Sequence, residues 1–217
     1  EPDGSMIEVA EKGILWIQCT VKGKSTHGST PDRGVNAHLA AADLIVTLDR
    51  ELHARFDARD DVFDPPISTF AVTKAEPGAP SINTVPGEHI FYIDCRVLPR
   101  YGLGQVLEAT QQCATGVDRS RGTATEVTAV QRMDAAAPTP SDAAVVKALE
   151  AAVKEVYDVE ARPMGIGGGT VAACIRRKGF HAAVWARMDE TMHGPNEYCI
   201  ISNLLGDAKV FAHLLLT

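Results

Sequence analysis

The stretch ILWIQCTVKG, residues 14–23, decides the fold, because it predicts the first β-strand of a longer alternating pattern. It is rich in β-branched and aromatic residues and ends in a Lys-Gly turn. From Val35 to Phe56 apolar residues recur at helical spacing, and Asn36 or Asp32 can supply the start of that helix. This region therefore begins with a strand followed by a helix.

Four further elements continue the pattern. They are strands at 67–74 and 89–98, a helix at 103–117 and a strand at 124–133. The order strand, helix, strand, strand, helix, strand is typical of a ferredoxin-like fold, in which an antiparallel sheet carries both helices on one face. We therefore predict a ferredoxin-like βαββαβ domain over residues 13–132, within a chain of mixed α/β (α+β) class.

After residue 133 the pattern becomes that of part of an α/β domain. We predict a helix from Ser141 or Asp142, a short helix after the glycine-rich segment GIGGGT (165–170), a strand at 181–187 and a closing helix at 202–216. One or two strands are too few to build a sheet. This segment, 133–217, is therefore expected to need partner strands from outside the chain.

Composition excludes several classes of protein. The 217 residues are 45% apolar and 23% charged, with a formal net charge of −7, which is ordinary for a globular protein and argues against nucleic acid as partner. No apolar run suggests a membrane span. Five scattered cysteines predict reduced thiols and a cytoplasmic location. Residues 1–12 are turn-rich and carry no signal segment, as expected for the middle of a longer protein.

Two of the seven histidines, His27 and His193, lie in loops among small residues with Pro or Gly, where a scaffold can present a side chain to a cleft. Asp189, Glu190 and Glu197 surround His193 and could orient a metal-bound imidazole. A zinc site needs three or four ligands, and the chain offers no H-x-x-x-H, H-E-x-x-H or C-x-x-C motif. Either His193 is structural, or the other ligands lie outside the chain.

The glycine-rich segment 165–170 lacks the lysine of a phosphate-binding loop and follows no clear parallel-strand pattern, so we exclude a nucleotide role. It is either a flexible helix entry or an anion-binding nest in which Thr170 takes part. Asp94 and Arg96 share one face of a strand. They form either a solvated cross-strand ion pair or a site in which Arg96 grips a substrate carboxylate. Asn83 lies in the loop before that strand, where a turn role is the default.

Five stretches, in this order, resemble the zinc-dependent amidohydrolases and exopeptidases that include succinyl-diaminopimelate desuccinylase, acetylornithine deacetylase and the aminoacylases. They are VKGKSTHGSTPDRGVNA (21–37), SINTVPGE (81–88), FYIDCRVLP (91–99), GIGGGTVAACIRRKG (165–179) and DETMHGPNEYC (189–199). The resemblance implies an α/β catalytic domain with two zinc (or cobalt) ions, interrupted by a ferredoxin-like lid that mediates homodimerisation. Residues 1–12 and 133–217 would then be catalytic segments and 13–132 the lid.

The resemblance also implies roles for single residues. His193 matches the last metal-ligand histidine of the family. His27 matches the lid histidine that reaches the partner subunit's active site and helps to polarise the scissile carbonyl. Five other residues match positions that hold the substrate's carboxylate or carbonyl oxygen, namely Asn83, Arg96, Gly168, Gly169 and Thr170. The family mechanism uses a zinc-bridging water as nucleophile and a glutamate as general base.

Several family residues are missing from this chain. The H-x-D motif, the bridging aspartate and the Glu-Glu pair precede the lid in the family. Glu1-Pro2 matches a carboxylate ligand of some members, but we expect that ligand a few residues upstream. The sequence thus predicts part of a dinuclear zinc hydrolase that cleaves the amide bond of an N-acyl amino acid or small peptide, and that is inactive as this chain alone. The alternatives are a non-catalytic ferredoxin-like module, which binds a small carboxylate or a partner strand, and a degenerate relative kept for dimerisation.

Overall fold

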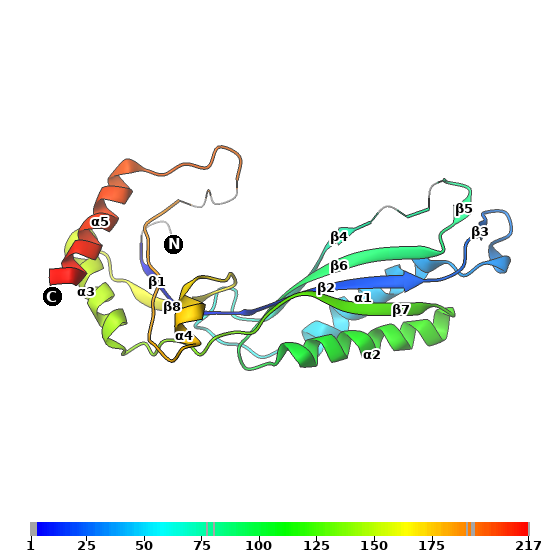
Figure 1. Ribbon diagram of the computed structural model, residues 1–217, viewed down its shortest axis with the longest axis horizontal. Coiled ribbons are helices and arrows are strands. Elements are labelled where there is room, and N and C mark those ends of the chain that lie inside the picture. The colour runs from blue at the N-terminus through cyan, green and yellow to red at the C-terminus, as the bar shows by residue number, and fades with distance from the viewer. Residues whose placement is uncertain (1–3, 77, 80, 190, 192–193, 217) are drawn as a thin grey trace. The chain divides into compact units, whose positions relative to one another are not determined.

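The computed structural model describes residues 4–76, 78–79, 81–189, 191 and 194–216 (Figure 1). The chain divides into two compact units. The sheet unit comprises residues 12–60 and 65–134, and the terminal unit comprises residues 1–11, 61–64 and 135–217. The short segment 61–64, which interrupts the sheet unit in sequence, therefore belongs to the terminal unit.

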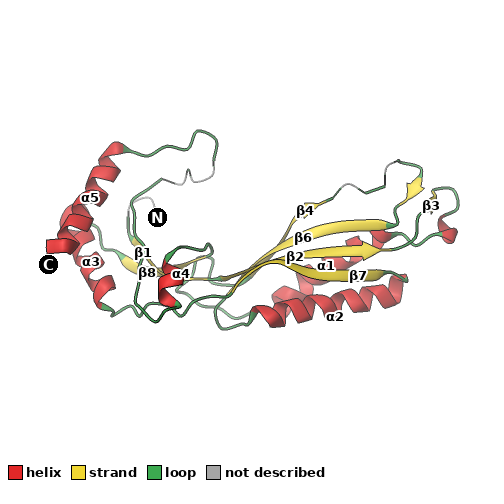
Figure 2. Ribbon diagram, viewed as in Figure 1, coloured by secondary structure: helices red, strands yellow, loops and turns green. Residues whose placement is uncertain are grey.

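The sheet unit has a four-stranded antiparallel sheet in the order β4-β6-β2-β7, with two helices on one face (Figure 2). Its main elements are β2 (Gly13–Lys22), α1 (Ala37–Arg55), β4 (Thr69–Ala75), β6 (Glu88–Val97), α2 (Leu103–Arg121) and β7 (Ala124–Met133). Three short elements are added, β3 (Thr26–His27), the 3-10 helix η1 (Pro31–Arg33) and β5 (Thr84–Val85). The predicted βαββαβ order and the α+β class are confirmed.

The core of the sheet unit lies between the sheet and its helices. Along β6 buried and half-buried residues alternate, so that Phe91, Ile93 and Cys95 face the helices. The helix α1 begins where the side chain of Asn36 accepts hydrogen bonds from the peptide N–H groups of His38 and Leu39, so one of the two predicted start residues is correct.

The terminal unit is built around a parallel pair of strands, β1 (Met6–Glu11) and β8 (Arg162–Ile166). Three helices accompany this pair, α3 (Ala144–Tyr157), α4 (Ala172–Arg176) and α5 (Ile201–Leu216), and α3 packs against α5. The register of the strand pair shifts between Glu8 and Ala10, which marks a β-bulge.

Three predictions for this unit are wrong. Residues 181–187 form no extended strand, because only Val184 pairs with another strand, in a single bridge to Glu8. The helix α3 begins at Ala144 and not at Ser141 or Asp142, because the N–H of Ala143 closes a turn onto the carbonyl of Pro140. A parallel strand does precede the glycine-rich segment, although β8 contains Pro and Gly and is weak as a local strand signal.

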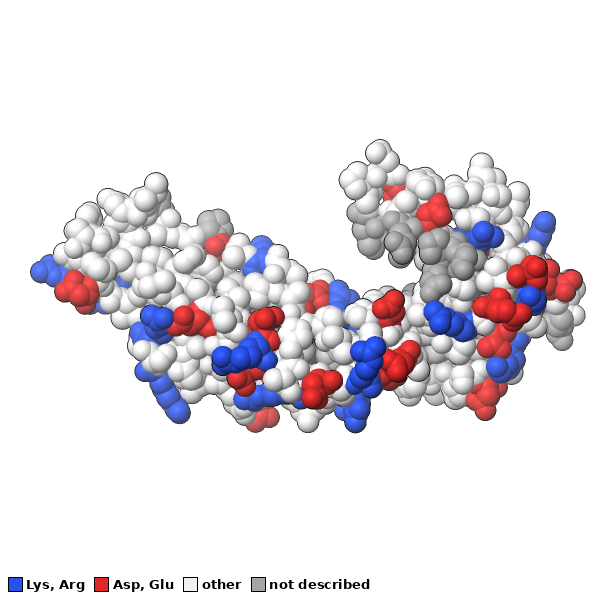
Figure 3. Space-filling model, turned by 180° about the vertical axis from the view of Figure 1, so that it is seen from behind, with Lys and Arg blue, Asp and Glu red and all other residues white. Residues whose placement is uncertain are grey.

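The surface is mixed in charge. On the face drawn in Figure 3, Lys and Arg side chains are interspersed with Asp and Glu, as is typical of a solvated surface. Within the described residues, no helix is both long enough and apolar enough to span a membrane.

Candidate functional site

The backbone segments that carry His27 and Asn83 are paired at one end of the sheet unit. The strands β3 and β5 pair His27 with Thr84, and the N–H of Gly28 donates to the carbonyl oxygen of Asn83 at 2.6 Å. A Cβ atom on Gly28 would lie 3.0 Å from that oxygen, so glycine allows the close approach. Both His27 and Asn83 are exposed, at the tip where β3 and β5 lie in Figure 1.

Local hydrogen bonds determine which nitrogen of the neutral His27 ring carries the proton. The peptide N–H of Ser29 donates to Nδ1 of His27 at 3.2 Å, and the Ser29 hydroxyl lies 2.8 Å from the same nitrogen. Because a peptide N–H can only donate, Nδ1 is an acceptor, and the neutral imidazole carries its proton on Nε2. The histidine therefore offers an N–H donor at its outer nitrogen.

The side-chain amide N–H groups of Asn83 are also available to a ligand. Its Oδ1 accepts a hydrogen bond of 2.5 Å from the Ser81 hydroxyl. Within the part of the chain that the structure describes, no group accepts a hydrogen bond from the Asn83 side-chain amide. The tip thus presents two neutral kinds of donor, an imidazole N–H and an amide, which suits a carbonyl oxygen that gains negative charge.

Arg96 lies elsewhere on the sheet unit. It lies eight positions along β6 from Glu88, the end of the strand near the tip, which corresponds to roughly 26 Å of extended chain. Its guanidinium makes a two-pronged ion pair with Asp94 of the same strand, with Nε–Oδ1 and Nη2–Oδ2 distances of 2.5 and 2.8 Å. Asp94 and Arg96 therefore do form an ion pair, as one of the two predictions had it, but the pair lies along one strand and not across two. Arg96 does not join His27 and Asn83 within one protomer.

The glycine-rich loop lies at the carboxyl end of β8. Gly168 and Thr170 are half-buried and Gly169 is exposed. Among the described residues, none accepts a hydrogen bond from the peptide N–H groups of Gly168, Gly169 or Thr170. Three neighbouring donors of this kind can bind a carboxylate. The anion-binding nest stays a prediction.

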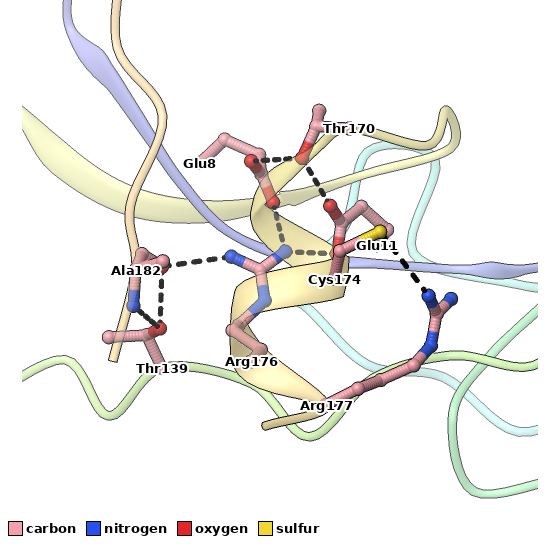
Figure 4. A network of polar contacts seen from close by, with 8 residues as sticks. All are labelled: Glu8, Glu11, Thr139, Thr170, Cys174, Arg176, Arg177 and Ala182. Carbon is pink, nitrogen blue, oxygen red and sulfur yellow. Dashed lines mark hydrogen bonds and ion pairs between the residues drawn. The ribbon is translucent and has the colours of Figure 1, made fainter. Parts of the chain in front are cut away.

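The hydroxyl of Thr170 points into a buried cluster of charges that the sequence analysis missed (Figure 4). It donates to Oε1 of Glu11 at 2.5 Å and lies 3.4 Å from Oε2 of Glu8. The Nη2 atom of Arg176 contacts both carboxylates, with a distance of 2.8 Å to Oε1 of Glu8. The side chains of Glu8, Glu11 and Arg176 are 3%, 2% and 1% exposed, so the cluster is dry.

Two carboxylates share one guanidinium in this cluster, and the pKa of Glu8 responds. The pKa of Glu8 is raised to about 7, chiefly by burial and then by the neighbouring charge of Glu11, against the opposing effects of Arg176 and Thr170. The sequence held a weak signal for the cluster, because acidic residues in an apolar strand (IEVAE, 7–11) and an arginine in a short apolar helix need partners.

The predicted metal ligand His193 lies outside the described residues, as do Glu1 and Glu190. Among the residues that are described, no group of three His, Cys, Asp or Glu side chains is placed to hold a metal ion. The described part of the chain therefore does not supply a metal site by itself.

Comparison with known proteins identifies the sheet unit. Residues 9–121, just over half of the chain, match the family model described as a peptidase dimerisation domain. An uncharacterized metallohydrolase of Methanococcus maripaludis is 37% identical over 99% of this chain and 54% of its own length. An acetylornithine deacetylase of Myxococcus xanthus is 26% identical over 94% of this chain and 52% of its own length.

A solved structure agrees with these matches. A tripeptidase of Staphylococcus aureus superposes on 98% of this chain and 53% of its own length, with a TM-score of 0.79 and 21% sequence identity, which shows a common fold. The chain spans about half the length of the curated relatives it matches. Relatives of this kind imply a metal cofactor. The chain therefore belongs to the family of metallohydrolases that carry the peptidase dimerisation domain.

Proposed function

We propose that the chain is the dimerisation lid and the C-terminal catalytic segment of a dinuclear zinc hydrolase, in which cobalt can replace zinc. The substrate class is an N-acyl amino acid or a small peptide, and the scissile bond is an amide. The observation that carries this proposal is the exposed tip, where His27 offers Nε2–H and the neighbouring strand segment carries the exposed Asn83. Such donors are suited to a carbonyl oxygen that becomes an oxyanion during hydrolysis.

The separation between this tip and Arg96 supports an active site shared between two protomers. One active site needs its donors within a few ångströms of the substrate, whereas about 26 Å of strand lie between Glu88 and Arg96. A two-fold dimer places the tip of one protomer near a different part of the other. We therefore assign His27 and Asn83 to the partner's site, and Arg96 to the site of its own protomer.

The edge strand β4 and the helix α1 form the proposed dimer interface. A groove of about 310 Å³ between them is lined mainly by apolar side chains, including Val46, Phe70 and Val72. Both Val46 and Val72 are exposed, and the edge of β4 carries unpaired backbone groups that a second strand can cover. A second copy of the chain fits this surface, since the matching family model is a dimerisation domain.

The terminal unit exposes an apolar surface that supports its assignment to a larger catalytic domain. The helix α5 exposes large apolar side chains on several sides, and a helix that is apolar all round is normally buried. Those on α5 are Ile201, Leu204, Leu205, Phe211, Leu215 and Leu216. We propose that the remaining part of the catalytic domain packs here and supplies the other metal ligands and the general base, with His193 as the ligand from this chain.

In the complete enzyme the residues of this chain bind and orient the substrate. The peptide N–H groups of Gly168, Gly169 and Thr170 hold its carboxylate, and Arg96 contributes to the same recognition. The tip donors of the partner bind the carbonyl oxygen. The metal supplies an activated water when it is bound. The free thiols of all five cysteines are in keeping with the proposed cytoplasmic location.

The test is hydrolysis of N-acetyl and N-succinyl amino acids and of dipeptides by the full-length protein that contains this chain. We expect turnover that a chelator abolishes and that zinc or cobalt restores, and no turnover by residues 1–217 alone. Binding of these compounds without hydrolysis by the metal-loaded full-length protein would favour the non-catalytic carboxylate-binding module instead.

A further inference from the structure

The bulge in β1 determines which side chains meet Arg176. In a regular strand, residues three positions apart point to opposite faces. Here Glu8 lies opposite Met164 and Ala10 lies opposite Gly165, so one extra residue is inserted between them. The insertion turns Glu8 and Glu11 to the same side, where both carboxylates contact Nη2 of Arg176.

The cluster ties the two ends of the glycine-rich loop to the same strand. The loop leaves β8, which pairs with β1, and it enters α4, which carries Arg176. Arg176 is held further by a hydrogen bond of 2.9 Å from Nη1 to the carbonyl of Ala182. Ala182 is in turn bound to the hydroxyl of Thr139 through both its N–H and its carbonyl. The loop is thus anchored on each side.

The hydroxyl of Thr170 is committed to this cluster. A hydroxyl carries one proton, and that of Thr170 is donated to Glu11 at 2.5 Å. It cannot donate to a substrate carboxylate at the same time. What Thr170 offers a ligand is therefore its peptide N–H, and its side chain acts as a tether.

We propose that Glu8, Glu11 and Arg176 are positioning residues, which hold the peptide N–H groups of residues 168–170 toward the substrate carboxylate through the hydroxyl of Thr170. This inference rests on the proposed function, in which the loop binds the substrate. Stability alone does not call for such a cluster, because well-packed apolar side chains replace a buried ion pair at equal or lower free-energy cost. The polar cluster instead fixes one conformation of the loop.

The experiment compares variants of the metal-loaded full-length protein. Thr170→Val removes the hydroxyl of residue 170 at nearly constant size, whereas Thr170→Ser keeps a hydroxyl there. Glu11→Gln replaces the carboxylate that accepts the hydrogen bond from this hydroxyl with a weaker, neutral acceptor. The double variant Glu11→Gln with Thr170→Val tests whether the two residues act together. Glu160→Gln, on an exposed carboxylate of the terminal unit, is the matched control. Two experiments are done: one measures hydrogen exchange of the peptide N–H groups of residues 166–171, and the other measures KM and kcat for an N-acetyl amino acid.

Loss of the tether should speed exchange in residues 166–171 and raise KM about tenfold, with a smaller change in kcat, as expected when one hydrogen bond that orders a binding loop is lost. Thr170→Ser should behave like the wild type, and the double variant should be no worse than the poorer single variant. Unchanged loop exchange in Thr170→Val, or additive effects in the double variant, would overturn the proposal.

The proposal can still be tested if one variant fails to fold or if the full-length protein is inactive. If Glu11→Gln does not fold, the pair Thr170→Val and Thr170→Ser decides alone, because neither changes a charge. If the full-length protein hydrolyses none of the substrates, the proposed function fails, whereas the exchange measurement still reports whether the cluster orders the loop.

Discussion

The peptide N–H of Gly28 donates a hydrogen bond of 2.6 Å to the carbonyl oxygen of Asn83, and this contact holds the two halves of the tip together. A methyl group at Gly28 would press on that oxygen from 3.0 Å. We expect Gly28→Ala to lower kcat of the full-length enzyme about tenfold by displacing His27, as small misplacements of catalytic donors do. Gly104→Ala, where a Cβ meets nothing within 4 Å, is the control and should leave kcat unchanged.

The protonation of Glu8 predicts an unusual dependence of stability on pH. The pKa of Glu8 is raised from 4.5 to about 7 by burial and by Glu11, so the folded state holds a proton that the unfolded state releases. This stabilisation is complete below pH 4.5 and is lost as the pH rises to about 7, a change of roughly 3 kcal/mol in the free energy of unfolding. Chemical unfolding of Glu8→Gln from pH 4.5 to 8 should lack this slope, whereas Glu160→Gln should keep it. A wild-type curve that rises monotonically over this range, and is matched by Glu8→Gln, would contradict the assignment.

The stability of the sheet unit should depend on pH in the opposite direction, falling as the pH is lowered. The Nδ1 atoms of His89 and His38 lie 3.0 Å apart, and burial, followed by the charge of His38, lowers the pKa of His89 below 6.5. The folded state therefore resists protonation. Its stability is full above pH 6.5 and falls as the pH drops through the lowered pKa. Thermal unfolding of residues 12–134 between pH 5 and 8 checks this. His89→Gln should reduce the loss of thermal stability at acidic pH. His53→Gln, at an exposed site, should leave that loss unchanged.

The dimer edge can be tested with a pair of valines. Val72 lies on β4 beside the apolar groove, and Val130 lies on the opposite edge strand β7; both are exposed. A charge on the proposed interface would lose apolar contact and remain desolvated. We expect Val72→Asp to convert residues 13–132 from dimer to monomer in sedimentation at tens of micromolar, roughly the range in which such interfaces are populated. Val130→Asp should stay dimeric. If Val130→Asp were monomeric and Val72→Asp dimeric, the interface would lie at β7 instead of β4.

Local patterns predicted the sheet unit well, because its elements carry their own signals. The alternation along β6 and the capping side chain of Asn36 are visible within a few residues. The terminal unit was harder to predict, since its strands depend on distant partners. The strand β1 pairs with β8, far along the chain, and the expected strand at 181–187 finds only one bridge.

Some parts of the candidate site could likewise be predicted from local sequence, and others could not. The tip histidine stands out because it lies in a polar loop among small residues, and the glycine-rich loop because of its composition. The buried cluster does not, because only the bulge in β1 brings Glu8 and Glu11 onto one side, and a bulge leaves no local trace in a sequence of mostly apolar residues. Likewise, the pairing of Arg96 with its own strand neighbour depends on side-chain conformation.

The central claim is that His27 completes the active site of the neighbouring protomer. In the full-length enzyme His27→Ala should lower kcat about 100- to 1,000-fold with little change in KM, as for the loss of one oxyanion donor. His193→Ala should weaken metal binding instead. The decisive measurement mixes these two inactive variants, lets subunits exchange, and records hydrolysis while mass spectrometry confirms heterodimers. Each heterodimer has one complete site, so activity should recover to roughly a quarter of wild type, given random pairing in a two-fold dimer. Confirmed heterodimers without activity would show that His27 does not act across the dimer.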